Sequence, residues 1–224
     1  MRLCLGGILG LFLISACSTS PPTQHPATKP FVKRPHGKVK LELADHAQFL
    51  QNDPRWSRQT LGGSGQSLKS HGCLVTAAAM ALTNLGFKTD PGDLTNRLKA
   101  NGGFTKNGQL IWSGLERVTG GKAKTVFYRK KDAYTVRHCL AAGFYPLVKF
   151  ELPTRTHWAV VIKETTNGFY IRDPIVSMST LIPLSTRAPG IDAVRCIGLN
   201  TSKVQNIASI ENYNGYNDEG LFTP

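Results

Sequence analysis

Residues 70–87 read SHGCLVTAAAMALTNLGF, and this stretch predicts a buried helix that begins at or just after a cysteine. The segment 74–85 is rich in Ala and Leu, which are strong helix formers, and Gly86 is a typical residue directly after a helix. Cys73 would then lie at the helix N-terminus, where free backbone N–H groups favour a thiolate. Gly72 is expected to leave room for a substrate beside the sulfur. A thiol held on a rigid core helix is suited to act as a nucleophile.

The segments around this helix predict an α+β fold. Further helices are expected over 90–102, with Asp90 as N-cap and Pro91 in the first turn, over 109–118 and over 131–143. The later sequence is rich in β-branched and aromatic residues, and Thr166-Asn167-Gly168 predicts a tight hairpin. Helices followed by antiparallel strands indicate α+β rather than an alternating parallel sheet. Strands are expected over 123–129, 145–152, 157–164, 168–174 and 192–199.

The N-terminus has the layout of a secretory signal, with Arg2 followed by an apolar run too short to cross a bilayer comfortably. The sequence Ile14-Ser15-Ala16-Cys17 resembles the lipobox of bacterial lipoproteins. The resemblance implies that residues 1–16 are removed and Cys17 is acylated, and Ser18 implies sorting to the outer membrane, facing the periplasm or the surface. An ordinary secretory signal with a chance cysteine is the alternative.

The remaining organisation follows from composition. Residues 17–40 are interpreted as a lipidated N-terminus and a Pro-rich tether, whose Lys and Arg side chains either strengthen membrane anchoring or only keep a linker soluble. Residues 41–200 suffice for one domain, and residues 201–224 would form a C-terminal extension. In a secreted lipoprotein of net charge +13, anionic lipid, lipopolysaccharide or wall polymer is a more plausible acidic neighbour than nucleic acid.

The cysteine count predicts one free thiol in the domain. Signal cleavage would remove Cys4, and acylation would occupy Cys17, so that three of the five cysteines are left. An odd number in an oxidising compartment leaves one cysteine unpaired. If Cys139 pairs with Cys196, Cys73 is free. That pairing is a hypothesis, because the sequence does not show how close the two residues come.

Other candidate catalytic residues lie on the predicted strands and before the helix. His157 opens the strand HWAVVIKE and is the preferred base, with His71 as a rival. Asp173 lies on the next strand of the hairpin, where it could accept the second imidazole N–H and fix the tautomer. Acyl transfer also needs a donor to the developing oxyanion, for which Gln51 and Gln66 are both candidates.

Taken together, the stretch 51–57 (QNDPRWS), Gly72-Cys73 followed by Thr76 and a small-residue helix, His157 before a Val-rich strand, and Asp173-Pro174 resemble the papain-fold cysteine peptidases similar to bacteriocin-processing, double-glycine-leader peptidases. The resemblance spans about residues 46–199. It implies N-terminal helices packed on an antiparallel β-sheet, a peptide or protein substrate, and no cofactor or metal. It also implies the roles of nucleophile, base, orienting acid and oxyanion donor for Cys73, His157, Asp173 and Gln51. Leu74 departs from the usual Gly or Ala and leaves the substrate type open.

Three alternatives stay open at this level. An NlpC-type cell-wall peptidase is one, although His71-Gly72-Cys73-Leu74 differs from the Asp-Cys-Ser-Gly run usual there. A non-catalytic, surface-anchored binding module of the same fold is another. A zinc site from Cys73, His71 and His157 lacks any paired ligand spacing. The chain is expected to act as a monomer attached to the membrane by its lipid anchor.

Overall fold

The computed structural model describes residues 41–177 and 179–200. The expected signal peptide (1–16), the lipidation site Cys17 with the tether (17–40) and the extension (201–224) lie outside the described residues. No helix in the described ranges is long and apolar enough to span a bilayer. The described elements, in chain order, are α1 (Leu68–His71), α2 (Cys73–Asn84), α3 (Pro91–Ala100), α4 (Ser113–Val118), β1 (Ala123–Phe127), α5 (Ala133–Ala141), β2 (Tyr145–Leu152), β3 (Arg155–Thr165), β4 (Gly168–Arg172), β5 (Ile182–Pro183), the 3₁₀ helix η1 (Leu184–Thr186) and β6 (Ala193–Leu199).

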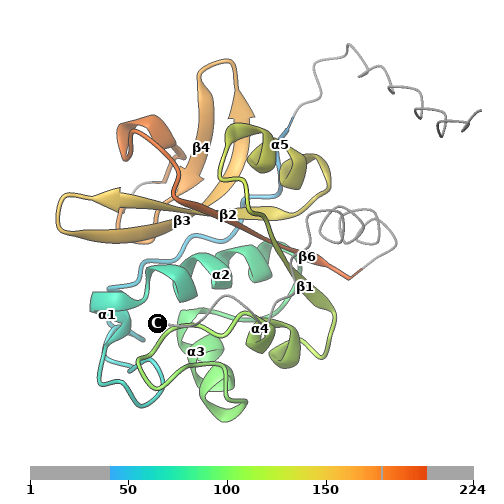
Figure 1. The fold of residues 1–224 in the computed structure, drawn as a ribbon. Coiled ribbons are helices and arrows are strands. Elements are labelled where there is room, and N and C mark those ends of the chain that lie inside the picture. Colours follow the sequence, from blue (N-terminus) through green and yellow to red (C-terminus); the bar gives the residue numbers. More distant parts are fainter. Residues whose placement is uncertain (1–40, 178, 201–224) are drawn as a thin grey trace, which may run out of the picture. The chain divides into compact units, whose positions relative to one another are not determined.

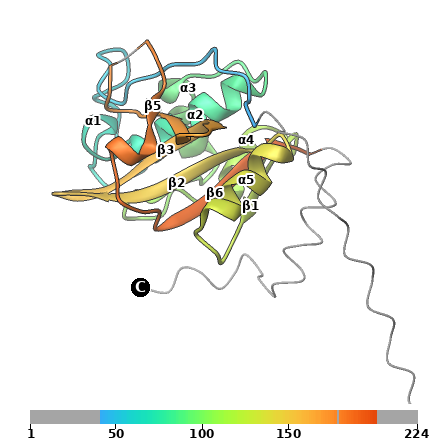
Figure 2. The same cartoon turned by 90° about the horizontal axis from the view of Figure 1, so that it is seen from above.

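The six described strands form one sheet in the order β1-β6-β2-β3-β4-β5, and every neighbouring pair is antiparallel. Figure 1 shows α1 to α4 gathered on one side of this sheet, and Figure 2 shows the same arrangement from above. Helices that precede an antiparallel sheet confirm the expected α+β class. The central strands are buried on both faces, since Leu147 packs with α2 in one core cluster and Val148 packs with α5 in the other.

Helix α2 is the centre of the first core cluster. Its residues Ala77 to Ala81 are fully buried, and small side chains allow this close approach to the sheet. The helix ends at Asn84, and Gly86 adopts a positive φ of 94°, which is the helix stop that the sequence predicted. Asn84 also accepts hydrogen bonds from the backbone N–H groups of His46 and Ala47, so the N-terminal segment of the domain is fastened to the end of this helix.

The helix expected over 109–118 is shorter in the structure, where α4 begins only at Ser113. Gly108 has a φ of 76° and reverses the chain, so that Leu110 pairs with Phe104 in an isolated antiparallel bridge. The apolar residues before Ser113 therefore belong to a small hairpin-like loop. The elements α1, β5 and η1 were not anticipated, because each is too short to show a periodic pattern.

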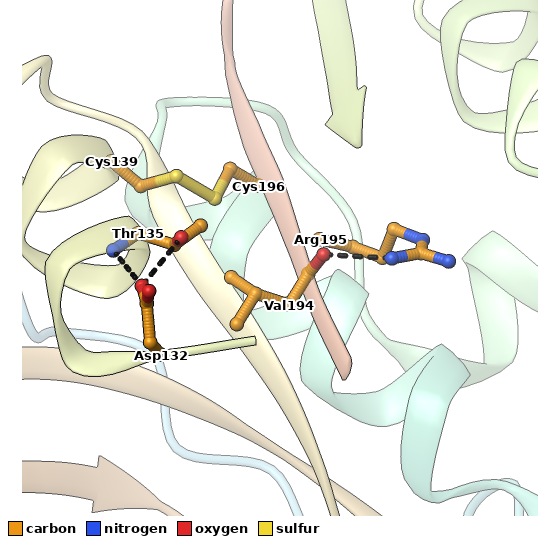
Figure 3. The surroundings of a disulfide bond; sticks show 6 residues. All are labelled: Asp132, Thr135, Cys139, Val194, Arg195 and Cys196. Atoms are coloured by element: carbon orange, nitrogen blue, oxygen red, sulfur yellow. Dashed lines mark hydrogen bonds between the residues drawn. A yellow bond between two sulfur atoms is a disulfide. The ribbon is translucent and has the colours of Figure 1, made fainter. Parts of the chain in front are cut away.

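Cys139 and Cys196 form a disulfide, as hypothesised, and join α5 to β6 (Figure 3). Asp132 caps α5 by accepting hydrogen bonds from the backbone N–H and the hydroxyl of Thr135, each at 2.8 Å. Both cysteines are fully buried. Cys73 is left as the free cysteine of the described residues.

Candidate active site

The thiol of Cys73 occupies the position that the sequence predicted, because Cys73 is the first residue of the twelve-residue helix α2. The short helix α1 precedes it, and Gly72 is the residue between them. A Cβ atom on Gly72 would overlap the carbonyl oxygen and the side chain of Leu68. Gly72 is therefore required for the tight α1–α2 junction, a reason that the sequence analysis did not anticipate.

His157 and Asp173 meet in the interior next to this junction. The Nε2 atom of His157 lies 2.7 Å from Oδ1 of Asp173, and the two residues are 1% and 5% exposed. The ring of Phe150 packs edge-on against the imidazole, with 5.3 Å between ring centroids. Phe150 is the residue directly opposite His157 in the β2–β3 pair. The imidazole is thus held by a carboxylate and an aromatic ring.

A register shift in the β3–β4 hairpin brings these two side chains to the same face. Lys163 pairs with Tyr170, but Val161 pairs with Ile171, so β3 has one extra residue between them. Continuing this register places Ala159 opposite Asp173, and Ala159 shares a face with His157 because side chains alternate along a strand. Without the bulge the register would move by one residue, and Asp173 would project to the other face.

The carboxylate of Asp173 is fixed by three donors. Besides the imidazole, Oδ1 accepts the backbone N–H of Ile175 at 3.0 Å, and Oδ2 accepts Nε of Arg187 at 2.8 Å. Burial raises the pKa of Asp173, but the hydrogen bonds and the positive partners outweigh it and hold the pKa below its ordinary value. Arg187 follows η1, fourteen residues beyond Asp173, and no pattern in the sequence pointed to it.

The imidazole of His157 also interacts with the thiol of Cys73. Burial acts to lower the pKa of His157, but its hydrogen bond to Asp173, the interaction with the thiol of Cys73 and the charges of both groups raise the pKa to about 9. Because Nε2 is used by Asp173, Nδ1 is the nitrogen available to the thiol. The structure therefore places the predicted base, His157, so that one imidazole nitrogen serves the predicted orienting acid, Asp173, and the other is available to the predicted nucleophile, Cys73.

Gln51 hydrogen-bonds both to the segment that follows Asp173 and to the helix that precedes Cys73. Its backbone N–H donates to the carbonyl of Pro174, next to Asp173, at 2.9 Å, and its Nε2 donates to the carbonyl of Lys69, within α1, at 2.7 Å. The side chain is 2% exposed, and its Oε1 has no hydrogen-bond partner among the described residues. One hydrogen of Nε2 binds Lys69, which leaves the second hydrogen for a group in the cleft.

An open cleft of about 840 Å³ contains these groups, and Gln51, Cys73 and His157 all line it. Gln66 and His71, the second oxyanion candidate and the rival base, line the same cleft. The Nδ1 atom of His71 lies 2.9 Å from the hydroxyl of its neighbour Ser70. Within the described ranges, no three His, Cys, Asp or Glu side chains are grouped as ligands for a metal ion.

Comparison with known proteins supports the fold. No profile of a known protein family matches the sequence, and no curated protein matches it. The fold resembles the crystal structure of a protein from Bacillus anthracis that carries the provisional name of a C39-like peptidase. The TM-score is 0.50 at 16% identity, and the match covers 73% of this chain and 99% of the other. The described domain therefore has the α+β fold of this C39-like peptidase, in agreement with a papain-like arrangement.

Proposed function

We propose that this protein is a thiol hydrolase that cleaves peptide or other amide bonds through an acyl-enzyme at Cys73. The observation that carries the proposal is a free cysteine at the start of a buried helix, in the same cleft as a buried histidine whose Nε2 lies 2.7 Å from the carboxylate of Asp173. A nucleophile and a base in one cleft, with an acid that orients the base from the interior, are the parts that acyl transfer requires. The fold shared with a C39-like peptidase agrees with this chemistry.

In the proposed reaction, the sulfur of Cys73 attacks the carbonyl carbon of the amide. The backbone N–H of Cys73 and the second Nε2 hydrogen of Gln51 donate to the oxyanion. His157 gives its proton to the amide nitrogen, the C–N bond breaks, and the amine leaves a thioester behind. A water molecule then attacks the thioester while His157 accepts its proton, and a carboxylic acid is released with the thiol restored. Asp173 stays ionised throughout and keeps the imidazole oriented.

The choice between the two glutamines follows from their contacts. Gln51 is buried and is held by both its backbone and its side chain, whereas the hydrogen bonds of Gln66 to other described residues involve only its main chain. We expect Gln51→Ala to lower kcat about 100-fold and Gln66→Ala to lower it less than about fivefold. Equal effects of the two substitutions would show that Gln51 is not the donor.

The proposal extends to the location of the enzyme. The lipobox at residues 14–17 supports lipidation of Cys17 and an anchored enzyme in the bacterial cell envelope, most simply at the outer membrane. Mass spectrometry of the purified protein would detect an acylated N-terminal Cys17. A mature chain that begins elsewhere would exclude the anchor without affecting the proposed chemistry.

The central test is alkylation of the non-reduced protein with iodoacetamide, followed by peptide mapping. We expect rapid modification of Cys73, no modification of Cys139 and Cys196, and a much slower reaction of Cys73 in His157→Gln. Cys73→Ala should fold normally and have no hydrolase activity. A Cys73 that reacts no faster than N-acetylcysteine, or hydrolysis that persists in Cys73→Ala, would refute the proposed function.

A further inference from the structure

The charged residues that line the cleft all have the same sign. Lys149, Arg155 and Arg195 line it, and no Asp or Glu of the described residues does. Lys149 and Arg155 form no ion pair with a carboxylate in the described part of the chain, and the guanidinium of Arg155 instead donates to a carbonyl oxygen. A cleft wall that carries cations and no carboxylates creates a positive potential where a substrate would bind.

The sheet register places two of these cations side by side on the cleft face. Lys149 lies directly opposite Trp158, which also lines the cleft, in the β2–β3 pair. In the β2–β6 pair, Lys149 is opposite Ala193 and Leu147 is opposite Arg195, so Lys149 and Arg195 are diagonal neighbours on one face. Diagonal neighbours are close enough for two long side chains to reach one ligand group.

Arg195 is held in a fixed orientation. Its guanidinium lies 4.8 Å from the ring centroid of Phe127, its partner in the β1–β6 pair, and its Nη1 donates to the carbonyl of Val194 at 2.8 Å. Figure 3 shows the side chain on the opposite side of β6 from the Cys139–Cys196 disulfide. The disulfide therefore ties β6 to α5 on one face of the sheet, while Arg195 lines the cleft on the other face.

Aromatic residues continue the cleft wall from Arg195 toward the β3 strand. Trp112 contacts Phe127 and Trp158 edge-on, at 5.7 and 5.8 Å between ring centroids, and both tryptophans line the cleft. A positive group beside apolar ring surface is suited to a side chain with an aliphatic stem and an acidic end.

The third cation, Arg155, lies close in sequence to the proposed base, His157. Arg155 is two residues before His157, at the start of β3, and its Nη1 donates to the carbonyl of Ser70 in α1 at 3.4 Å. The guanidinium thus reaches from the β2–β3 hairpin to the helix that precedes the Cys73 nucleophile. Arg155 and Lys149 approach the cleft from different strands.

We propose that the cleft selects acidic peptides, with a Glu or Asp carboxylate near the scissile amide bound by Lys149, Arg155 and Arg195. This inference rests on the proposed function and adds the substrate class. Charge-assisted hydrogen bonds to a carboxylate are stronger than those to the corresponding amide, so a Glu substrate is expected to be cleaved about tenfold faster than its Gln counterpart. A C-terminal carboxylate offers the same chemistry and is distinguished by the tests below.

The first test measures the potential at the thiol without any substrate. Cys73 is alkylated with iodoacetate, which is anionic, and with iodoacetamide, which is neutral, and the ratio of the two rates is normalised to that of N-acetylcysteine. We expect Lys149→Gln and Arg155→Gln each to lower the ratio about two- to fourfold, and roughly 0.5 M NaCl to reduce the effect. Lys130→Gln removes the same charge at an exposed position outside the cleft and should leave the ratio unchanged.

The second test uses a defined pool of peptides in which each sequence occurs with Glu or Gln at each position and with a free or an amidated C-terminus. Mass spectrometry of the products should show Glu enriched close to the cut, and the enrichment should fall in Arg155→Gln. Because Arg155 is exposed, this substitution should leave the fold intact. Enrichment only of free C-termini would assign the carboxylate to the peptide end.

The two proposals fail separately in these experiments. If Cys73 reacts rapidly with iodoacetamide but the normalised rate ratio is the same in Lys149→Gln, Arg155→Gln and Lys130→Gln, the acidic preference is refuted and the hydrolase proposal stands. Equal cleavage of Glu and Gln peptides would likewise refute the acidic preference alone. If Cys73 shows no enhanced reactivity, the proposed function itself is refuted.

Discussion

Replacement of Asp173 by Asn tests the electrostatics of the site without requiring a substrate. Asn has the same shape and keeps an oxygen for the imidazole and for the N–H of Ile175, but it removes the negative charge and the ion pair with Arg187. The prediction concerns the pKa of His157, which is about 9 against an ordinary value of 6.5. At about 1.4 kcal/mol per pH unit, the site favours the imidazolium by roughly 3 kcal/mol.

Asp173 is the larger of the two groups that raise this pKa, and Cys73 is the smaller. In Asp173→Asn only Cys73 still offsets the burial of the imidazole, so we expect the pKa of His157 to fall below about 7. Cys73→Ala leaves the carboxylate in place and should lower the pKa less. The order of the two variants is therefore part of the prediction.

The assay is an NMR titration of the imidazole Cε1–H signals from mildly acidic to alkaline pH, with the His157 signal assigned from its loss in His157→Gln. His138 provides an internal control, because burial lowers its pKa and the substitution does not touch its surroundings on α5. A folded Asp173→Asn protein in which His157 keeps its pKa of about 9 would refute the reasoning. So would a larger fall in Cys73→Ala than in Asp173→Asn.

Three further predictions follow from the same contacts. Because the pKa of His157 is raised from 6.5 to about 9, protonation of His157 stabilises the fold by up to about 3 kcal/mol below pH 6.5, and this contribution is lost as the pH rises through 9. The free energies of unfolding of wild type and His157→Gln, measured in urea, should therefore converge at high pH. Arg187→Ala should reduce kcat/KM about three- to tenfold, because Asp173 loses a donor that fixes it, with partial recovery in Arg187→Lys. It should also raise the pKa of His157 detectably, because a positive charge near the imidazole is removed; an unchanged titration would make Arg187 purely structural. Replacing Cys139 and Cys196 by Ala, which opens a loop of 57 residues, should lower the free energy of unfolding by about 4 kcal/mol in urea titrations, whereas a loss under about 1 kcal/mol would contradict this role.

Much of the fold could be predicted because its main elements are long and locally consistent. The range 145–152 matches β2, and the predicted helix stop at Gly86 and N-cap at Asp90 are both present. Local signals of this kind depend only on backbone preferences and burial periodicity, which a single sequence records. The helix predicted over 109–118 was wrong in its first part, because the apolar residues before Ser113 bury themselves through a bridge to Phe104 and a turn at Gly108 overrides the helical spacing.

The candidate site residues could be selected from the sequence, whereas the residues that hold them in place could not. Cys73, His157, Asp173 and Gln51 lie in short stretches with distinctive neighbours. The structure places His157 against Asp173, and Cys73, His157 and Gln51 line one cleft. Arg187 and Phe150 could not be found, since each acts through a contact set by the strand register and by a loop path. Such contacts leave no mark in local sequence.

The β3 bulge shows how a small irregularity controls the whole site. Alternation along β3 and β4 would put Asp173 on the wrong face of the sheet if the hairpin kept the register that begins at Thr165 and Gly168. The extra residue between Val161 and Lys163 changes the register by one, and only then can the carboxylate reach the imidazole at 2.7 Å. Because Ile162 at this point is fully buried against α2, the bulge is held by the same core that positions Cys73. Packing of helix α2 and alignment of His157 with Asp173 are therefore one structural requirement, and a deletion at Ile162 should abolish both.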